Sequence, residues 1–329
     1  MQWFLCALIT FLAWGTADLF YKKGADEKDK YSHLKTSMMV GFVMGAHAIC
    51  TIIFGDIGYD FNNLWRYLPV SAMYIISMTI GYFGLRYLEL SISSPIQNAS
   101  GAIVCIMCLI FLHKSLDLLS AIAVVLICAG VILLGVFEKK KQSDYESKEN
   151  KKYKIGMVAF LMPILYCIFD SLGTFFDAWY LDDVDSTFLV NVTEETFEDV
   201  ANTSYELTFF FCAILIFIYL YVIKKEKFTL FKKTEQTQQD GEGKVAVRNN
   251  IQFFRLGAAV LETAGQFTYV IAMSGRGEVA APMIASYCIC SVILSRIFLK
   301  EKLDAKQYFV VAIVMIGIAL LGVVEGLSE

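Results

Sequence analysis

Three carboxylates lie inside long apolar runs of the sequence. Glu262 is near the centre of the run 251–273, while Asp18 and Asp170 are nearer the ends of theirs. An ionisable group costs roughly a few kcal/mol inside a bilayer, so each is a functional candidate. We expect such a carboxylate to bind a proton, a cation or a cationic substrate; the alternative is a structural hydrogen bond between helices. Because Asp18 and Asp170 lie closer to water, we expect their substitution to be milder.

Aromatic and amide side chains accompany these carboxylates at helical spacing. Gln266 and Tyr269 follow Glu262 at i+4 and i+7, which places the three on one face of a helix. Trp14 and Tyr166 each precede an aspartate by one turn, where a ring could wall a pocket or stack on a cation. Packing alone would also account for these rings, because aromatic residues make up 14% of the chain.

Uncharged amides open another apolar run, 93–113. Gln97 and Asn98 can donate and accept hydrogen bonds, as hydroxyl- or amide-bearing substrates require; alternatively, they hold neighbouring helices together. Tyr74 and Tyr82 lie two turns apart in the preceding run and could line the same cavity. The sequence shows no phosphate loop, metal-ligand cluster or catalytic triad, and predicts neither an enzyme nor a cofactor.

The composition indicates an integral membrane protein. Of the 329 residues 57% are hydrophobic and 18% are charged, against about 25% charged in soluble domains. The mean hydropathy is +0.57, and a soluble globule of this size could not bury so much apolar surface. The net charge of −4 argues against a nucleic-acid binder. We expect a lipid bilayer and a small-molecule substrate as partners, with the oligomeric state left open.

Ten apolar runs are each long enough to cross a bilayer, which takes about 20 residues in a helix. The sequence therefore predicts an all-α integral membrane fold with ten transmembrane helices, at roughly 2–21, 34–54, 67–88, 93–113, 118–137, 154–175, 203–223, 251–273, 278–298 and 306–324. The glycines of Gly41-x-x-x-Gly45 in the second run predict a close contact with another helix.

Three long polar connections divide the chain. The basic linker 138–153 separates a first unit, 1–137, from a second, 154–329. Polar loops at 177–202 and 224–250 lie within the second unit. We expect 138–153 and 224–250 to be solvated or mobile, because they are rich in Lys, Glu, Gln and Asp. The loop 177–202 is acidic and contains no Lys or Arg.

Basic residues gather on one side of the predicted membrane. If successive loops alternate, 25 of the 28 Lys and Arg fall on one side, and only Arg66, Lys114 and Arg276 fall on the other. The positive-inside rule then places the basic loops in the cytoplasm and both termini outside a plasma membrane. The acidic loop would lie outside too, with the glycosylation sequons at Asn191 and Asn202 in it or at its edge.

The two halves of the sequence repeat one another. At a shift of 187 residues, 95–138 aligns onto 282–325 without a gap, and 14 of the 44 positions are identical, Pro95 and Pro282 among them. A unit of five helices places its second copy upside down in the membrane. Two inverted five-helix repeats are typical of secondary transporters, whose site lies near the midplane between the halves.

Two motifs carry a family resemblance. The first helix contains Ala13-Trp14-Gly15-Thr16-Ala17-Asp18 before Lys22-Lys23-Gly24, and the ninth ends in Phe298-Leu299-Lys300-Glu301-Lys302-Leu303. The sequence resembles the drug/metabolite transporter superfamily, specifically its EamA-type ten-helix members. This resemblance implies two five-helix repeats with small-residue fourth and ninth helices. Two departures stand out: the first-half exit, His113-Lys114-Ser115-Leu116, has no glutamate, and family members are often drawn with cytoplasmic termini.

The sequence predicts a secondary transporter that moves a small polar metabolite by alternating access, with a proton as one option for the coupling ion. Two alternatives remain open. One is a carrier of divalent or organic cations, suggested by the membrane carboxylates. The other is a non-transporting receptor or scaffold that binds a partner through the acidic loop 177–202. A polar cavity between the halves would favour transport.

Overall fold

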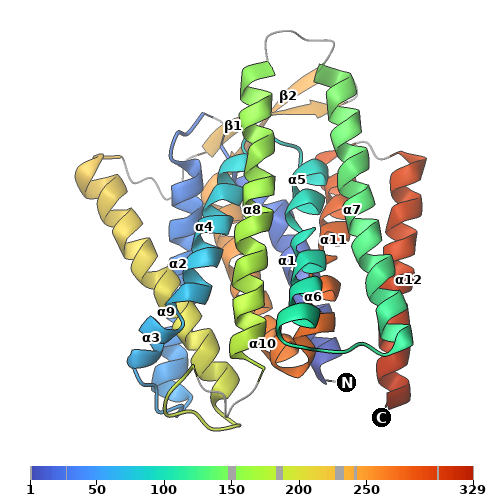
Figure 1. Cartoon of the computed structure of the whole chain (residues 1–329). Helices are drawn as coiled ribbons and strands as arrows, with labels where there is room; N and C mark the ends of the chain where they lie inside the picture. Colours follow the sequence, from blue (N-terminus) through green and yellow to red (C-terminus); the bar gives the residue numbers. More distant parts are fainter. Residues whose placement is uncertain are drawn as a thin grey trace.

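The protein is a bundle of helices that run roughly parallel and antiparallel (Figure 1). The computed structural model describes the backbone of residues 2–26, 28–146, 153–182, 188–226, 233–240, 243–301 and 304–328. Within these ranges, nine helical spans are long and apolar enough to cross a membrane, and Leu68–Gly84 is a shorter apolar helix. These elements give the ten-helix membrane fold that the sequence predicts.

The first half contains seven helical segments: α1 (Gln2–Gly24), α2 (Ser32–Phe54), α3 (Asn62–Arg66), α4 (Leu68–Gly84), α5 (Leu90–Gln97), α6 (Ser100–Phe111) and α7 (Leu118–Glu146). The second half contains α8 (Tyr153–Tyr180), α9 (Phe197–Phe217) with the π-helical η1 (Ile218–Ile223), α10 (Ile251–Ala285), α11 (Cys288–Leu294) with the π-helical η2 (Ser295–Leu299), and α12 (Ala305–Ser328). Arg276 has non-helical backbone angles and divides α10 into two membrane spans.

Helices of one half find their main partners in the other half. The most extensive contacts join α1 to α10, α4 to α8, α2 to α9, and α7 to α12. In the repeat, α1 corresponds to α8 and α4 corresponds to α10, so the first two pairs are symmetry copies of each other. The other two pairs each join a helix to its own repeat equivalent. The helix packing therefore follows the inverted repeat seen in the sequence.

One helix in each half is broken at the equivalent point. The first break separates α5 from α6 at residues 98–99, and the second separates α10 from α11 at 286–287. A shift of 187 residues brings the two breaks within one residue of each other. Pro95 and Pro282 lie just before the breaks, where each proline removes one backbone donor from the helix.

Small residues allow the two broken helices to meet. A Cβ atom on Gly101 would lie 2.5 Å from the Ala285 Cβ and 2.9 Å from the Pro282 Cα. The Gly41–Gly45 spacing in α2 has the same effect, because a side chain on Gly41 would overlap the Phe209 carbonyl of α9. The predicted close contact at this motif is confirmed.

The predicted loops are shorter than the sequence suggests. Residues 138–146 extend α7 beyond the membrane span, while 147–152 lie outside the described residues. Helix α8 continues to Tyr180, so Asp177 lies in a helix and not in the acidic loop. Helix α9 begins at Phe197, and Asn202 is buried in it; the expectation of an exposed second sequon was wrong.

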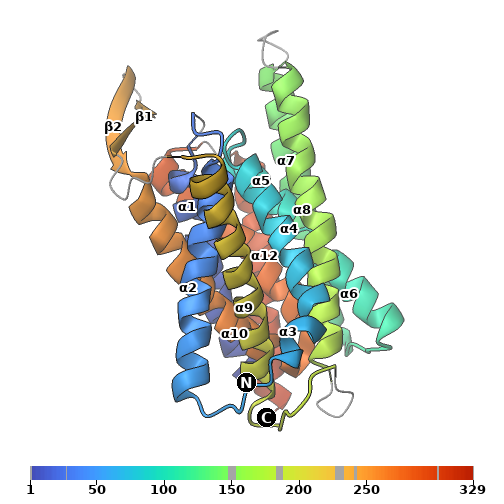
Figure 2. The same ribbon diagram turned by 90° about the vertical axis from the view of Figure 1, so that its left-hand side faces the viewer.

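A two-stranded antiparallel hairpin replaces much of the expected loop 224–250. Strands β1 (Lys233–Asp240) and β2 (Gly243–Asn250) pair from Lys233 opposite Asn250 to Asp240 opposite Gly243. The hairpin and the far ends of α7 and α8 project from the same end of the bundle (Figure 2). The sequence does not predict this hairpin, because the β1 segment is polar throughout and has no alternating apolar residues.

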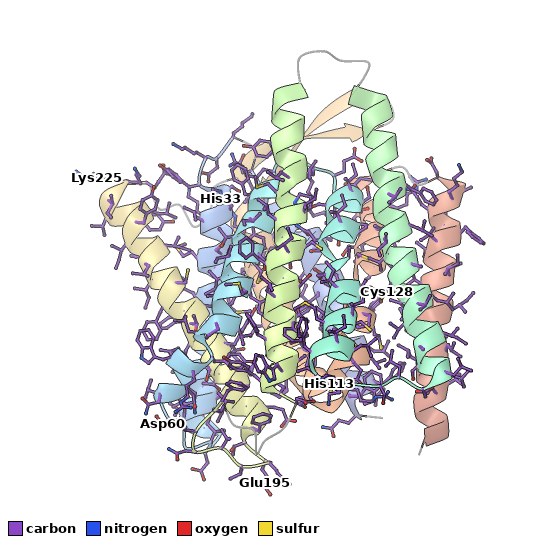
Figure 3. All side chains as sticks on the ribbon, viewed as in Figure 1. His33, Asp60, His113, Cys128, Glu195 and Lys225 are labelled. Atoms are coloured by element: carbon purple, nitrogen blue, oxygen red, sulfur yellow. The ribbon has the colours of Figure 1, made fainter. Side chains whose placement is uncertain are left out.

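The two ends of the bundle can be told apart by the termini and by the residues that lie there. Both termini lie at the end opposite the α7–α8 projection (Figure 1). Lys225 and His33 mark the projecting end, whereas Asp60, His113 and Glu195 mark the end with the termini (Figure 3). Large apolar side chains such as Leu118, Leu215 and Phe309 are exposed on the outer surface, as a bilayer requires.

Candidate functional site

A cavity lies in the centre of the bundle, between the two halves. Its volume is about 60 Å³ of space open to the centres of water molecules, enough for a few waters or a small solute. Residues of α1, α4, the two broken helices, α8, α9 and α10 line it: Trp14, Asp18, Tyr21, Tyr74, Met78, Gly81, Tyr82, Leu85, Gln97, Asn98, Ser100, Gly101, Tyr166, Asp170, Thr174, Tyr205, Glu262, Tyr269, Ala281, Ile284, Ala285 and Tyr287.

Asp18 connects α1 to both broken helices. Its Oδ2 accepts a hydrogen bond from the Ser94 hydroxyl on α5 at 2.6 Å and from the Ser291 hydroxyl on α11 at 2.7 Å. The side chain is 8% exposed, the same fraction as that of Glu262. Asp18 is therefore no closer to water than Glu262, and the basis for expecting a milder effect at Asp18 was wrong.

Glu262 faces the cavity from the middle of α10. Its Oε2 accepts a hydrogen bond from the Tyr21 hydroxyl at 3.2 Å, and the Tyr21 ring packs against Tyr82 with centroids 4.5 Å apart. The backbone carbonyl of Glu262 accepts a hydrogen bond from the Trp14 indole N–H at 3.3 Å. Within the described residues, the phenol of Tyr21 is thus the side-chain donor to this carboxylate.

Asp170 contributes the third carboxylate from the middle of α8. Its Oδ2 accepts a hydrogen bond from the Ser100 hydroxyl on α6 at 2.7 Å. The α8 helix extends from Tyr153 to Tyr180, so Asp170 is not near an end of it, contrary to the prediction. None of the described residues that line the cavity is Lys, Arg or His. The three carboxylates are held by hydroxyl groups, and no basic side chain lines the cavity to neutralise them.

Aromatic rings form much of the cavity wall. The Trp14 ring lies 5.1 Å from the Tyr269 ring and 5.8 Å from the Tyr287 ring. The Tyr74 hydroxyl contacts the Tyr269 hydroxyl at 2.7 Å and donates to Thr174 Oγ1 at 2.8 Å. Among the described residues, eight aromatic side chains line the cavity, four from each half, so the rings join the two repeats across it.

The two predicted amides lie at the break between α5 and α6. Asn98 Nδ2 donates at 2.9 Å to the carbonyl of Ser94, the residue before Pro95, and the Asn98 backbone N–H donates to the same carbonyl at 3.0 Å. Gln97 Nε2 lies beside Gly81 on α4. Both amides line the cavity, so they are placed to contact a solute as well as the neighbouring helices.

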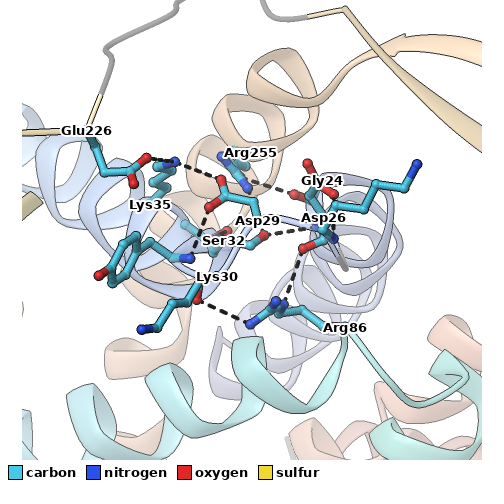
Figure 4. A network of polar contacts seen from close by, with 12 residues as sticks. Gly24, Asp26, Asp29, Lys30, Ser32, Lys35, Arg86, Glu226 and Arg255 are labelled. Carbon is cyan, nitrogen blue, oxygen red and sulfur yellow. Dashed lines mark hydrogen bonds and ion pairs between the residues drawn. The ribbon is translucent and has the colours of Figure 1, made fainter.

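A polar network ties the elements together at the projecting end of the bundle (Figure 4). Buried Arg255 donates to the Gly24 carbonyl at 3.1 Å and to the Ser32 hydroxyl at 2.8 Å. Arg86 donates to the Asp26 carbonyl at 3.2 Å. The α1–α2 connection is thus held by the start of α10 and by the α4–α5 connection.

An ion pair completes this network. Lys35 lies 2.7 Å from an Asp29 oxygen and 3.2 Å from a Glu226 oxygen. Burial alone raises the pKa of Asp29, but the hydrogen bond and charge of Lys35, together with the Tyr31 N–H and the Arg255 charge, leave that pKa below its usual value. Together with the contacts of Arg255 and Arg86, this ion pair holds the elements of the projecting end together.

A comparison with known protein families identifies the family of this chain. Residues 1–136 and 186–323 match the sequence profile of the EamA-like transporter family. The chain belongs to this family. No match was found among curated proteins. A solved structure titled "Crystal structure of protein" is 11% identical, with 99% of this chain and 98% of that one covered and a TM-score of 0.63; a likeness at this identity shows the fold alone.

The cavity of this EamA-like transporter gathers most of the predicted residues. Trp14, Asp18, Tyr74, Tyr82, Gln97, Asn98, Tyr166, Asp170, Glu262 and Tyr269 all line it. Gln266 does not: its side chain is 1% exposed, and its Nε2 has no hydrogen-bond partner among the described residues. The i+4 spacing from Glu262 therefore does not bring Gln266 to the cavity. The functional role of all eleven residues stays a prediction.

Several residues that line the cavity were not predicted from the sequence. Tyr21, Tyr205, Tyr287 and Thr174 line the cavity. No one-dimensional signal singles out these tyrosines, because 17 tyrosines and 26 phenylalanines are spread through the chain. The sequence repeat could have indicated one of them. At the shift of 187 residues Tyr287 aligns with Ser100, whose hydroxyl donates a hydrogen bond to Asp170.

Two further carboxylates have structural partners. Glu206 on α9 is completely buried and bonds the His47 ring of α2, with Oε2 2.7 Å from Nδ1. Glu301, from the family-like exit motif, accepts hydrogen bonds from the backbone N–H groups of Leu90 and Ser91 at the start of α5. A carboxylate suits these otherwise unpaired donors of a helix N-terminus. Within the described residues, no three Asp, Glu, His or Cys side chains gather as a metal site.

Proposed function

We propose that this EamA-like transporter is a secondary transporter that carries a small organic cation by alternating access. One observation carries the proposal: Asp18, Asp170 and Glu262 meet in a cavity between the repeats that aromatic rings wall and no basic side chain lines. Of the substrates considered from sequence, an organic cation fits this lining better than a neutral metabolite does.

The preference for a cation follows from electrostatics. Carboxylates without counter-charges are expensive in an apolar interior, so a bound cation offsets a cost that a neutral solute leaves in place. Rings of Trp and Tyr attract an ammonium group through their negative faces, by about 0.5–2 kcal/mol each. Trp14, Tyr269 and Tyr287 stand together on the wall, and they suit an alkylated ammonium group better than a bare metal ion.

The repeat architecture supports alternating access. The cavity lies where the two broken helices meet, and inverted repeats of this kind exchange conformations around a central site. The contacts of Arg255, Arg86 and Lys35 hold the elements of the projecting end together. Breaking them would open the cavity on that side, and separation of the helices at the other end would expose it to the opposite side.

The proposed orientation places the projecting end in the cytoplasm. Of the 28 Lys and Arg, 25 belong to the loops and helix ends of that side, and the positive-inside rule assigns such a side to the cytoplasm. Both termini would then lie outside, and we propose the plasma membrane as the location. The units 1–137, 138–153 and 154–329 remain the proposed division of the chain.

A ligand screen on the purified protein tests the substrate class. Choline and its neutral isostere 3,3-dimethylbutan-1-ol have the same shape and differ in charge, so the pair isolates the ammonium group. We expect organic cations of this size to raise the unfolding temperature, because a ligand at 100 times its Kd stabilises the fold by about 2.7 kcal/mol. Amino acids, sugars and nucleosides complete the panel.

Transport in proteoliposomes then tests the mechanism. We expect a stabilising cation to enter vesicles and to exchange with unlabelled cation across the membrane. Stabilisation and uptake of neutral solutes alone would favour the polar-metabolite function instead. A protein that binds none of these solutes and instead binds a partner through the 181–196 connection would support the scaffold alternative.

A further inference from the structure

A fourth membrane carboxylate lies outside the cavity. Asp177 is one turn beyond the cavity residue Thr174 on α8, and its side chain is completely buried. The Tyr67 hydroxyl, from the junction of α3 and α4, donates a hydrogen bond to Asp177 Oδ1. The Tyr269 phenol of α10 lies beside the same carboxyl group. Asp177 is therefore enclosed by phenols from separate helices.

Among the described residues, the titratable groups that interact with Asp177 are phenols. Tyr67 and Tyr74 face it from the α3–α4 junction and from α4, Tyr205 from α9, and Tyr269 from α10. On α8 itself, Asp170 shares the Tyr74 neighbour with Asp177. Among the ion pairs of the described residues, none includes Asp177. A negative charge on Asp177 would have no cation to offset it.

The hydrogen atoms in this network can be counted. Tyr74 donates its only hydroxyl hydrogen to Thr174 at 2.8 Å, so Tyr269 is the donor in the Tyr74–Tyr269 contact at 2.7 Å. Tyr269 then has no hydrogen left for Asp177, but it has a free lone pair. Asp177 Oδ2 is buried and has no hydrogen-bond partner among the described residues. Tyr67 is therefore the hydrogen-bond donor that the structure gives Asp177, and Oδ2 has none among the described residues.

A proton on Asp177 removes the cost of a buried charge. An ionised carboxylate with a single donor and no cation costs several kcal/mol in a protein interior, whereas a carboxylic acid is neutral there. We infer that Asp177 is a proton-binding site, separate from the substrate cavity and occupied in this conformation. The site takes up one proton from water and forms a neutral acid.

The proton site is connected to the cavity through Tyr269 and Tyr74, because both of these residues line the cavity. Loss of the proton would leave a charge among phenols of α4, α9 and α10, and water would have to enter to solvate it. Proton release from Asp177 therefore favours separation of these helices at the end with the termini, while proton binding favours their closure. This coupling rests on the proposed transport function; the proton site itself does not.

Infrared spectroscopy tests the proton site without transport. The carbonyl stretch of a protonated carboxylic acid is distinct from that of a carboxylate, so the spectrum of the wild type at neutral pH minus that of Asp177→Asn isolates the group. We expect one buried-acid band to disappear in Asp177→Asn and to persist in the exposed control Asp56→Asn. Identical acid bands in the wild type and Asp177→Asn would overturn the inference.

A second variant serves if Asp177→Asn does not fold. Tyr67→Phe keeps the ring and removes the hydrogen bond to Asp177 Oδ1, so it leaves the acid in place and changes its carbonyl stretch. We expect the band of ¹³C-aspartate-labelled protein to shift to higher frequency in Tyr67→Phe. An unchanged band would show that no protonated Asp177 accepts this bond, which also overturns the inference.

Vesicle transport tests the coupling. Asn mimics the neutral acid permanently, so we expect Asp177→Asn to retain exchange of labelled for unlabelled choline but to lose accumulation driven by a pH gradient. Accumulation equal to that of the wild type would refute the coupling role. If the wild type itself fails to exchange any cation, the proposed function fails, while the infrared result still decides whether Asp177 binds a proton.

Discussion

Asp18 on α1 accepts a hydrogen bond from Ser291 on α11 at 2.7 Å, and this contact joins the first helix of one repeat to the broken helix of the other. The same Asp18 oxygen binds Ser94 on the broken helix of its own repeat. A cation that draws Asp18 toward the cavity would loosen or strengthen both bonds together. If the proposed cation binds Asp18, we therefore expect its binding to be linked to the position of the two broken helices.

The carboxylates of the cavity should be needed for binding a cation. We expect Glu262→Gln and Asp18→Asn each to weaken choline binding by about 2 kcal/mol, on the order of 30-fold in Kd, because both keep the side-chain size and delete the charge. Calorimetric titration of folded protein measures the effect, with the exposed Glu195→Gln as control. Wild-type affinity in Glu262→Gln would contradict the cation hypothesis; a variant lost from the membrane would point to a structural role.

The crossing of the broken helices should not tolerate a side chain at Gly101. In Gly101→Ala the new methyl group would meet the Ala285 methyl group at 2.5 Å, and such overpacking typically costs about 1–3 kcal/mol. Gly135→Ala is the matched control, since its nearest neighbour is an Ile96 carbon at 3.4 Å. Thermal unfolding in one lipid environment compares them, and equal stability of the two variants would refute the close crossing.

The contact of Asp29 with Lys35 should lose its contribution in acid. The folded-state pKa of Asp29 is lowered, so its stabilisation is complete above the usual aspartate pKa of about 3.9 and disappears as the pH falls through the lowered value. Asp29→Asn should therefore reduce the unfolding temperature at about pH 6 but hardly at about pH 2. A deficit that is the same at both pH values would argue against this ion pair, and Asp56→Asn serves as the exposed control.

Thiol labelling tests the orientation. All nine cysteines are free, so they are first replaced, and single cysteines are then introduced by Lys225→Cys at the projecting end and Glu195→Cys at the end with the termini (Figure 3). An impermeant reagent applied to intact cells should modify the Glu195→Cys protein and not the Lys225→Cys protein until the cells are opened. The reverse pattern would invert the proposed topology.

Much of the fold could be predicted from sequence because lipid imposes simple requirements. Apolar runs of spanning length must be helices, and the alignment of Pro95 with Pro282 revealed the repeat. Pairs one turn apart, such as Trp14 and Asp18, identified cavity residues because a polar group inside a span needs an enclosed place to face.

The remainder depends on contacts between distant residues. Asp177 follows the last long apolar stretch of its helix and reads as the start of a polar loop, but Tyr67, 110 residues earlier, donates to it and allows the helix to continue. Gln266 follows Glu262 at helical spacing, yet it is buried away from the cavity. Spacing predicts which residues share a helix face, but it does not predict which neighbouring helix covers that face. No local pattern encodes such pairings.

The pairing of α7 with α12 has a consequence for how the protein is made. Helix α7 packs most extensively against α12, yet α7 ends at Glu146 and α12 begins at Ala305. During translation, α7 therefore waits in the bilayer without its main partner until the last helix has been synthesised. The α7 face that α12 covers must therefore contact lipid until then, and a chain that terminates before Ala305 would leave this face without its helix partner.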